Sequence, residues 1–280
     1  MKLLFVTIAL AASFMGIAQP KLITKAIIST TTNVIVPEEE DVSQIQPQGQ
    51  GGGMNFRNFL DGEMKSTTYI KDELTKTSIK SETMKSSIFR NNATKTTTTI
   101  YEIMGNTQGV VSNDEEQEQM KKQMDSMIAA RAKTDTAIKQ RVRTVDVATT
   151  VTYLEETKKI AGYNCKKALL ITDRFVKRDT LAVWYTPDIK FANVPSTGGL
   201  AGVPMMRMMG GGGAANFDKI NGFVMMYETK MPRGRTMEVK VTKIEIDKDI
   251  AAKEFDIPKD VEIKTMKEMQ SGGAMRFMAR

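Results

Sequence analysis

The side chains with the most distinctive chemistry in this 280-residue chain are four methionines in the stretch PMMRMMGGGG, residues 204–213. The four are Met205, Met206, Met208 and Met209. Thioether sulfur is a soft ligand that suits Cu(I), so these residues hold the atoms of a copper site. However, Arg207 among them repels a cation, and the four glycines that follow do not preorganise a site. Copper handling is therefore only a third hypothesis, and we predict no metal site and no cofactor.

The groups that usually carry out catalysis are missing from the sequence. The chain has no histidine, which removes the commonest general base and metal ligand. Ser–His–Asp and Cys–His catalysis and HExxH zinc sites are thereby excluded. No GxxxxGK[ST] or GxGxxG phosphate-binding loop is present either. We therefore predict a protein that is not an enzyme.

A single cysteine, Cys165, lies in the strand-like run YNCKKALL. With one cysteine, no disulfide can form within the chain. Free cysteine commonly packs as a small buried hydrophobe, which is the interpretation we favour. The alternative is an exposed thiol that pairs with a second chain.

The first 18 residues have the pattern of a secretory signal peptide. Lys2 precedes an apolar run from Leu3 to Ile17, and small residues allow cleavage between Ala18 and Gln19. The run is shorter than the about 20 residues that span a bilayer, and no later segment is apolar enough to do so. We expect a periplasmic or extracellular mature protein with no membrane span.

The charged residues of the chain give a formal net charge of +7 but do not cluster. Basic residues alternate with threonines and acids, and no basic stripe with interleaved aromatic residues is present. Nucleic acid is therefore not an expected partner. We expect one domain over residues 19–267, with flexible loops at 43–57 and 191–217 and a loose tail at 268–280.

Most of this domain alternates polar and apolar residues and is rich in threonine and valine, which is typical of strands. The expected strands cover residues 21–36, 62–71, 74–82, 86–90, 94–104, 146–156, 163–173, 178–187, 222–230 and 236–247. A short strand or helical turn is expected after Pro258. Sequential strands with short turns indicate an antiparallel sheet.

One helix is expected from Ser112 to about Lys139. Ser112 and Glu115 have the spacing of a capping box. Four apolar side chains then form a single stripe, namely Met120, Met124, Met127 and Ile128. This stripe either packs on the sheet or belongs to a movable cover over a cavity.

Two strands, in RDTLAVWYTP and GFVMMYETK, are apolar on both sides and should be central. In TMEVKVTKIEID the apolar phase slips, which predicts a β-bulge near Thr242–Lys243. Bulges bend a strand, as a curved sheet requires. The predicted fold is mainly β (α+β): a large curved antiparallel sheet that forms an unclosed half-barrel, with a helix packed on its concave side.

The stretches TKKIAGYNCKKALL (157–170) and VWYTPDI (183–189) resemble a family of uncharacterised secreted proteins in the superfamily of the periplasmic lipoprotein carrier LolA. They also resemble the GLPGLI family, although GLAGVP (199–204) departs from the motif of that family. The resemblance implies a LolA-like half-barrel, which in the carrier shields the acyl chains of lipoproteins. It implies no catalytic residues.

Two functions follow as the main hypotheses. The first is binding or carriage of a hydrophobic ligand, a lipid or a lipidated protein, because methionine adapts to ill-defined apolar partners. The residues expected to line or cover the cavity are Trp184, Met205, Met206, Met208, Met209, Phe223 and Met225. The second is a structural or interaction module of the cell envelope, whose cavity is filled by its own side chains and whose partner is an envelope protein. An open concave face would favour ligand binding, and a concave face filled by the protein's own side chains would favour the structural module.

Overall fold

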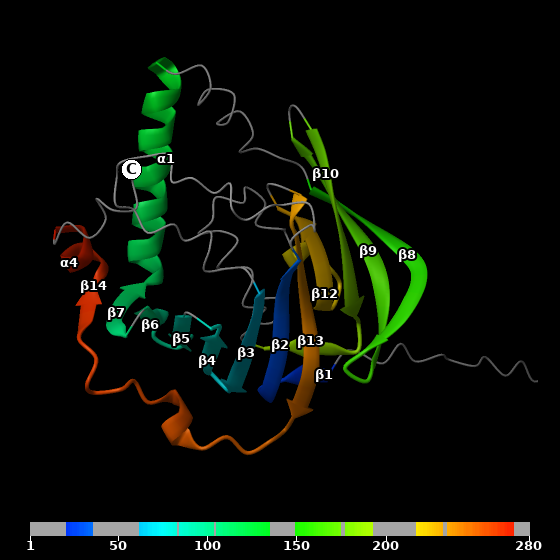
Figure 1. The fold of residues 1–280 in the computed structure, drawn as a ribbon, viewed down its shortest axis with the longest axis horizontal. Helices are drawn as coiled ribbons and strands as arrows, with labels where there is room; N and C mark the ends of the chain where they lie inside the picture. Colours follow the sequence, from blue (N-terminus) through cyan, green and yellow to red (C-terminus); the bar gives the residue numbers. More distant parts are fainter. Residues whose placement is uncertain are drawn as a thin grey trace, which may run out of the picture.

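The protein is mainly β, with one large unclosed mixed sheet and few helices (Figure 1). The computed structural model describes residues 21–35, 62–82, 84–103, 105–134, 149–174, 177–192, 217–231 and 234–271. In spatial order, the twelve strands of the large sheet are β14 (Ile263–Thr265), β7 (Asn106–Asn113), β6 (Thr96–Ile103), β5 (Met84–Asn91), β4 (Leu74–Lys80), β3 (Gly62–Lys71), β2 (Lys25–Ile35), β13 (Thr236–Ile246), β12 (Phe223–Lys230), β10 (Lys177–Thr186), β9 (Tyr163–Arg174) and β8 (Thr149–Ile160). The other elements are the parallel pair β1 (Lys21–Ile23) and β11 (Ile189–Phe191), the helices α1 (Asp114–Thr134) and α4 (Met266–Ser271), and the 3-10 turns η3 (Phe217–Lys219) and η5 (Ala252–Phe255).

The sheet is antiparallel at every junction except one. The short strand β14 pairs with β7 in parallel, which makes the sheet mixed where an antiparallel one was expected. The strand near the start of the chain, β2, pairs with β13 on one side and β3 on the other. The sheet therefore does not follow the order of the sequence, because β2 joins the two halves of the domain.

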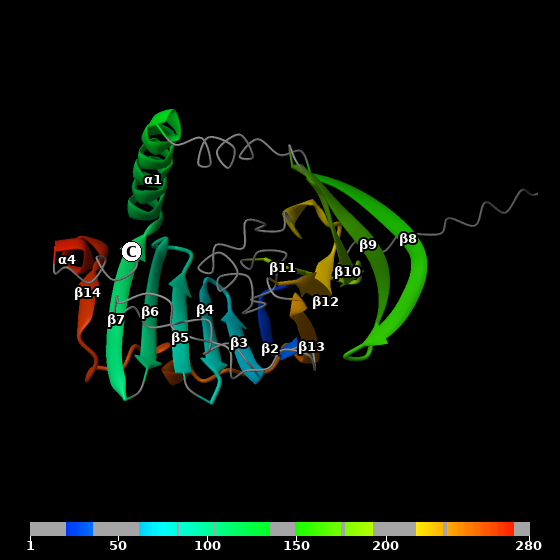
Figure 2. The same ribbon diagram turned by 45° about the horizontal axis from the view of Figure 1, so that its top comes forward.

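The sheet has an inner face, around which the strands curve, and an outer face, which the C-terminal segment crosses (Figure 2). Directly paired residues share a face. The inner face of the central strands carries the apolar core, where Val183, Tyr227 and Val239 are fully buried. On β3 and β4 the inner face is rich in hydroxyl groups, and Thr68 Oγ1 lies 3.0 Å from Thr77 Oγ1.

The two strands expected to be central, β10 and β12, are confirmed as neighbouring interior strands, and only β9 and β8 lie between them and one edge of the sheet. In β12, all five residues from Phe223 to Tyr227 are buried. The bulge expected near Thr242–Lys243 is also confirmed, since the pairing of β13 with β2 shifts register between Val241 and Lys243. Further register shifts lie between Trp184 and Tyr185 and in β8 between Tyr153 and Thr157.

Helix α1 begins one residue later than the expected capping box. Asn113 Oδ1 accepts a hydrogen bond from the Glu116 backbone N–H at 2.7 Å, and Glu116 Oε2 accepts one from the Asn113 N–H at 3.2 Å. The expectation that this helix packs on the concave side is not met by its described residues. The helix rises from the end of β7 and stands away from the sheet, and Met127 of the expected stripe is 58% exposed (Figures 1 and 2).

The C-terminal segment, residues 247–265, is held against the large sheet by several polar contacts. Lys71 Nζ donates to the Ile250 carbonyl at 2.8 Å, and Lys76 Nζ lies 3.4 Å from Glu254 Oε2. The Gly109 N–H donates to the Glu262 carbonyl at 3.2 Å. The element expected after Pro258 is both a strand, β14, and a short helix, α4.

Candidate binding site

The expected ligand-binding residues are separated in the structure. Met205, Met206, Met208 and Met209 lie outside the described residues. Phe223 and Met225 are core residues with 2% and 0% exposure, and the Phe223 ring packs edge-on against Phe191 at 4.8 Å between centroids. Within the described part of the chain, these two side chains contact other core residues and have no free surface.

Trp184 lies at a different place, on the outer face. It pairs with Lys167 of β9 and Met226 of β12. The ammonium groups of Lys158 and Lys167 each lie 5.6 Å from the centroid of its ring, within cation–π range. Lys167 also forms a 2.9 Å ion pair with Glu156. The indole is thus flanked by lysines, is partly buried, and packs against the core beside Met226.

A pocket of about 180 Å³ lies between the outer face of β4, β5 and β6 and the C-terminal segment. Its apolar lining comes from Leu74, Phe89, Phe255 and Ile257, and its other lining residues are Thr75, Arg90, Asn91, Thr96 and Thr98. Small-molecule sites commonly combine apolar walls with a few polar groups. Ile257 is 41% exposed, so the pocket is accessible from solvent at that wall.

The wall of the pocket that η5 forms is fixed to the sheet through Lys76. Its ammonium group lies 5.5 Å from the centroid of Phe89 and 5.8 Å from that of Tyr69. The same group forms the ion pair with Glu254 of η5. Because Phe89 and Lys76 are directly paired across β4 and β5, one lysine anchors both the floor and the wall.

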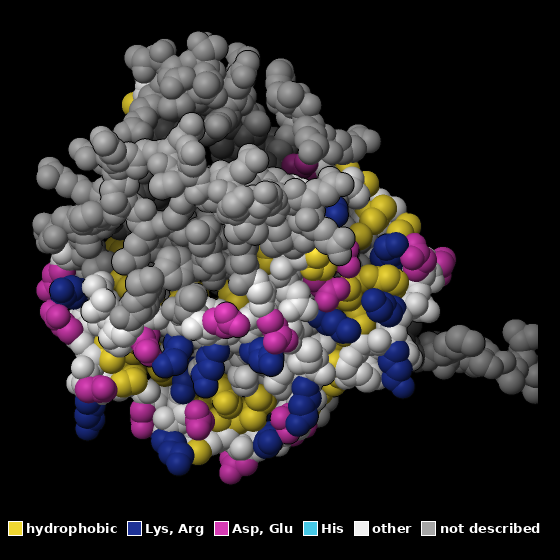
Figure 3. All heavy atoms as spheres, viewed as in Figure 1, with side chains coloured by type: hydrophobic (Ala, Val, Ile, Leu, Met, Phe, Trp, Pro, Cys, Tyr) yellow, Lys and Arg dark blue, Asp and Glu magenta, His cyan; other side chains and the backbone are white. Residues whose placement is uncertain are grey.

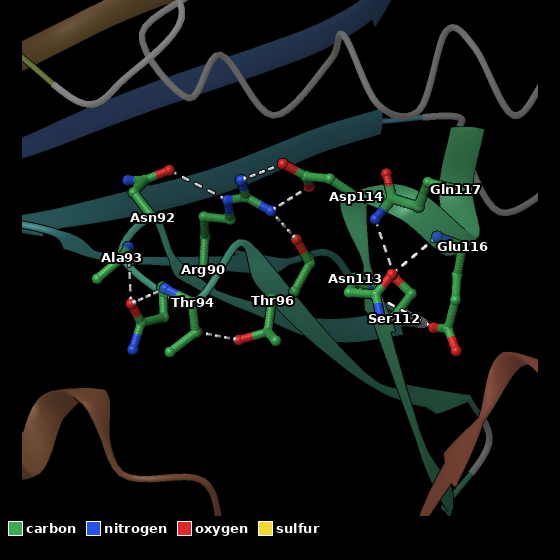
Figure 4. Close-up of polar contacts among 12 residues, drawn as sticks. Arg90, Asn92, Ala93, Thr94, Thr96, Ser112, Asn113, Asp114, Glu116 and Gln117 are labelled. Carbon is green, nitrogen blue, oxygen red and sulfur yellow. Dashed lines mark hydrogen bonds and ion pairs between the residues drawn. The ribbon is translucent and has the colours of Figure 1, made fainter. Parts of the chain in front are cut away.

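The strands beneath the pocket are joined to α1 by a bidentate ion pair (Figure 4). Arg90 Nη1 and Nη2 donate to Asp114 Oδ1 and Oδ2 at 2.6 and 2.9 Å. Arg90 also donates to Thr97 Oγ1 at 3.2 Å and to Asn92 Oδ1 at 3.1 Å. The hydrogen bonds from Arg90 lower the pKa of the Asp114 carboxyl, and the same interaction raises the pKa of the Arg90 guanidinium.

The turn between β5 and β6 is fixed by Asn91, which also lines the pocket. Its Oδ1 accepts hydrogen bonds from the backbone N–H groups of Ala93 and Thr94 at 3.0 and 3.2 Å. This is the Asx-turn geometry that makes asparagine common in turns. The side chain is thereby held at the rim of the pocket.

Cys165 is buried, as expected, and its thiol is free. Burial raises the pKa of this thiol to about 11, so it is protonated and inert at neutral pH.

Among the described residues, no group of three His, Cys, Asp or Glu side chains lies close enough together to form a metal site. No helix in the same residues is long and apolar enough to cross a membrane.

The surface in view in Figure 3 has no region of a single charge sign among its described residues. Lysine, arginine, aspartate and glutamate side chains are interspersed there, with hydrophobic side chains between them.

The pocket was not predicted from the sequence, because its strands and Phe255 are separated by more than 150 residues. The only local signal was the pair of apolar residues, Phe255 and Ile257, just before Pro258.

Residues 67–202, just under half of the chain, match the model of a family described as the N-terminal domain of N-glycanase. The chain is thus related to a domain of an enzyme, and that domain is not itself shown to be catalytic. No curated protein matches the chain.

Among solved structures, two of PNGF-II, from two different crystal forms, are similar at 15% and 14% identity, each with a TM-score of 0.37. They cover 89% and 88% of this chain, whereas the chain covers 33% and 32% of theirs, so it spans about a third of their length. An uncharacterised conserved protein from Thermus thermophilus is 9% identical, with a TM-score of 0.40, 87% of this chain covered and 91% of that one.

The resemblance to the LolA-like and GLPGLI families is therefore wrong. Both stretches on which it rested, 157–170 and 183–189, lie inside the N-glycanase match. They form the β8–β9 hairpin and the end of β10. Glycine at the turn and lysine and aromatic residues in the strands are compatible with many antiparallel sheets. The short motif indicated a hairpin and not a family.

Proposed function

We propose that the chain is a non-catalytic binding domain of the N-glycanase type, which holds a sugar of a glycoprotein in the pocket on its outer face. The observation that carries the proposal is the family match, because residues 67–202 include all of β4, β5 and β6, which line the pocket. The absence of histidine from the chain agrees with a role in binding.

The lining of the pocket supports a sugar as the ligand. A sugar ring presents an apolar face of C–H groups and a polar rim of hydroxyls. The pocket offers Phe89 and Phe255 for the former and Asn91, Thr96 and Thr98 for the latter. Its volume of about 180 Å³ is comparable to the cavity of about 150 Å³ that holds one benzene ring, so it accommodates one ring.

The test is binding of an N-glycan oligosaccharide and of N-acetylglucosamine, followed by calorimetry and by saturation-transfer NMR. Ile257→Trp fills the pocket and should reduce sugar binding at least about tenfold, or about 1.4 kcal/mol. Ile35→Trp is the matched control, because Ile35 is an exposed isoleucine on β2 that does not line the pocket.

Unchanged binding by Ile257→Trp would overturn the location of the site, and no binding by the wild type would overturn the proposal. Release of glycan from a glycoprotein by the purified chain would contradict the non-catalytic assignment.

A second candidate function is binding of a hydrophobic ligand, which the four apolar residues of the pocket favour. The volume suits one ring or a short acyl segment and is too small for a whole lipid. A fluorescent fatty acid should then bind the wild type and be excluded by Ile257→Trp. Failure of both the sugar and the probe to bind would leave an interaction module of the cell envelope as the remaining hypothesis.

We also propose that the protein is exported, on the basis of the signal-peptide pattern in residues 1–18, which lie outside the described residues. N-terminal sequencing of protein recovered from the periplasm or medium should begin at Gln19. Recovery of the intact N-terminus in the cytoplasm would contradict export.

A further inference from the structure

The strand β8 forms one edge of the large sheet. Its only strand partner among the described residues is β9, so one side of this twelve-residue strand is unpaired. The opposite edge is different, because β14 covers part of β7. An unpaired edge offers a row of backbone N–H and C=O groups to another strand.

The residues of β8 from Glu155 to Lys159 have a charge pattern that is complementary to itself. The sequence there is Glu-Glu-Thr-Lys-Lys. If two copies of this stretch pair in antiparallel fashion about a two-fold axis at Thr157, Glu155 lies opposite the partner's Lys159. Glu156 then lies opposite the partner's Lys158. Opposite charges at directly paired positions stabilise a sheet, and like charges destabilise it.

The side chains required for this pairing are accessible. Glu155, Thr157, Lys158 and Lys159 are all exposed, and Glu156 is 57% exposed although it contacts Lys167. The register shift between Tyr153 and Thr157 includes Glu155 and Glu156, and regular pairing with β9 resumes at Thr157 and continues to Ile160. The two-fold axis at Thr157 therefore lies at the start of the regular half of the strand, and a bulge beside it limits pairing with unrelated edges.

We propose that β8 is a homodimer interface, through which a second copy of this chain adds its own β8 across a two-fold axis at Thr157. The interface is isologous, so each pair of residues occurs twice. The two sheets then become continuous. Because the pairing depends on exposed charges, association weakens as ionic strength rises.

A charge exchange tests the proposal on the full chain by sedimentation velocity at low salt. Glu155→Lys places two lysine side chains opposite each other at this paired position, and Lys159→Glu places two glutamates there. Each variant alone should associate at least about tenfold more weakly than the wild type. An equimolar mixture of the two should dimerise again, because every contact between unlike copies is then attractive.

Three outcomes would overturn the proposal: a wild type that stays monomeric, single variants that dimerise as the wild type does, or a mixture that stays monomeric. Circular dichroism of each variant checks that the fold is kept, and recovery in the mixture cannot result from misfolding. Sugar binding at the outer-face pocket is measured on the same samples, so failure of the dimer and failure of the proposed function are separate results.

A cysteine at the two-fold axis gives a second test. Thr157→Cys brings two thiols together at directly paired positions, where the Cα spacing suits a disulfide. Mild oxidation should give a covalent dimer. Thr150→Cys is the matched control, as an exposed threonine of the same strand that lies off the axis. Cys165 does not interfere because it is buried. Equal cross-linking of both variants, or of neither, would contradict the pairing.

Discussion

The ion pair between Arg90 and Asp114 forms only because strand pairing brings together two residues that are distant in the sequence. Their side chains are 24 residues apart in sequence and meet because β5, β6 and β7 form consecutive hairpins. In the sequence, Asp114 is distinguished only as one of three acids in the first turn of the helix, where a negative charge is favourable. Its partner was not predictable, because the register of the two intervening hairpins decides which arginine reaches it.

Replacing Asp114 with asparagine should remove a pH-dependent part of the stability. The folded pKa of Asp114 is lowered, so its stabilisation is complete above the unfolded pKa of about 3.9 and is lost as pH falls through the folded value. At neutral pH we expect Asp114→Asn to lower Tm by about 1–3 °C. The difference from wild type should shrink below pH about 3.9. Thermal melts across the acid range measure it, and a difference independent of pH would contradict the assignment.

Gly222 has no room for a side chain. A Cβ at this position would overlap the Thr186 carbonyl oxygen and lie 2.8 Å from Tyr185 Cδ2. Backbone cannot yield as a flexible side chain can, so Gly222→Ala should lower the free energy of unfolding by about 1–3 kcal/mol. Gly162→Ala is the control, since Gly162 also has a positive φ but nothing within 4 Å of the added Cβ. Urea denaturation of both variants should show the larger loss at Gly222, and equal losses would mean that backbone strain alone matters.

At the scale of elements, the first residue of α1 could not be predicted from local sequence rules alone. Ser112 with Glu115 and Asn113 with Glu116 are both valid capping boxes. The choice is made by β7, in which Ser112 still pairs with Thr97 and is buried. Asn113 therefore becomes the cap. Most strands were predicted because period-two alternation is local, but β7 (NTQGVVSN), which lacks a clear alternation, was missed. The placement of α1 depends on where that strand ends.

The attachment of β14 depends on Gly109. A Cβ there would overlap Ile263 Cδ1 and lie 3.3 Å from the Glu262 carbonyl oxygen. Gly109→Ala should therefore loosen β14 from β7 and speed hydrogen exchange in residues 261–265, with a loss of about 1 kcal/mol in unfolding free energy. Gly105→Ala, which lies in the preceding turn with open space around it, is the control. Unchanged exchange in 261–265 would show that the close approach is not needed for pairing.

For the whole molecule, the sequence predicted most strands of the sheet, but it missed β7 and did not predict the order of the strands. The central position of β10 and β12 followed from residues that are apolar on both faces, and the bulge in β13 followed from a phase slip. The pairing of β2 with β13 joins Thr32 to Val239, more than 200 residues away, and no local pattern specifies it. The pocket was missed for the same reason, since Phe89 and Phe255 are brought together only by the path of the C-terminal segment.

Buried apolar residues are unevenly distributed among the strands, and this distribution predicts which segments unfold locally first. Fully buried apolar residues concentrate in β10, β12 and β13, whereas the C-terminal segment crosses the outer face with mostly exposed side chains. Regions with few buried apolar contacts open at lower free energy than the global unfolding. In hydrogen–deuterium exchange, peptides from β12 and β13 should be the slowest, and those from residues 248–265 should exchange at least about tenfold faster. Lys76→Met, which removes the ion pair with Glu254, should speed exchange in 250–257 and leave β12 unchanged. Equal protection of the C-terminal segment and β12 would show instead that the sheet and this segment unfold as one unit.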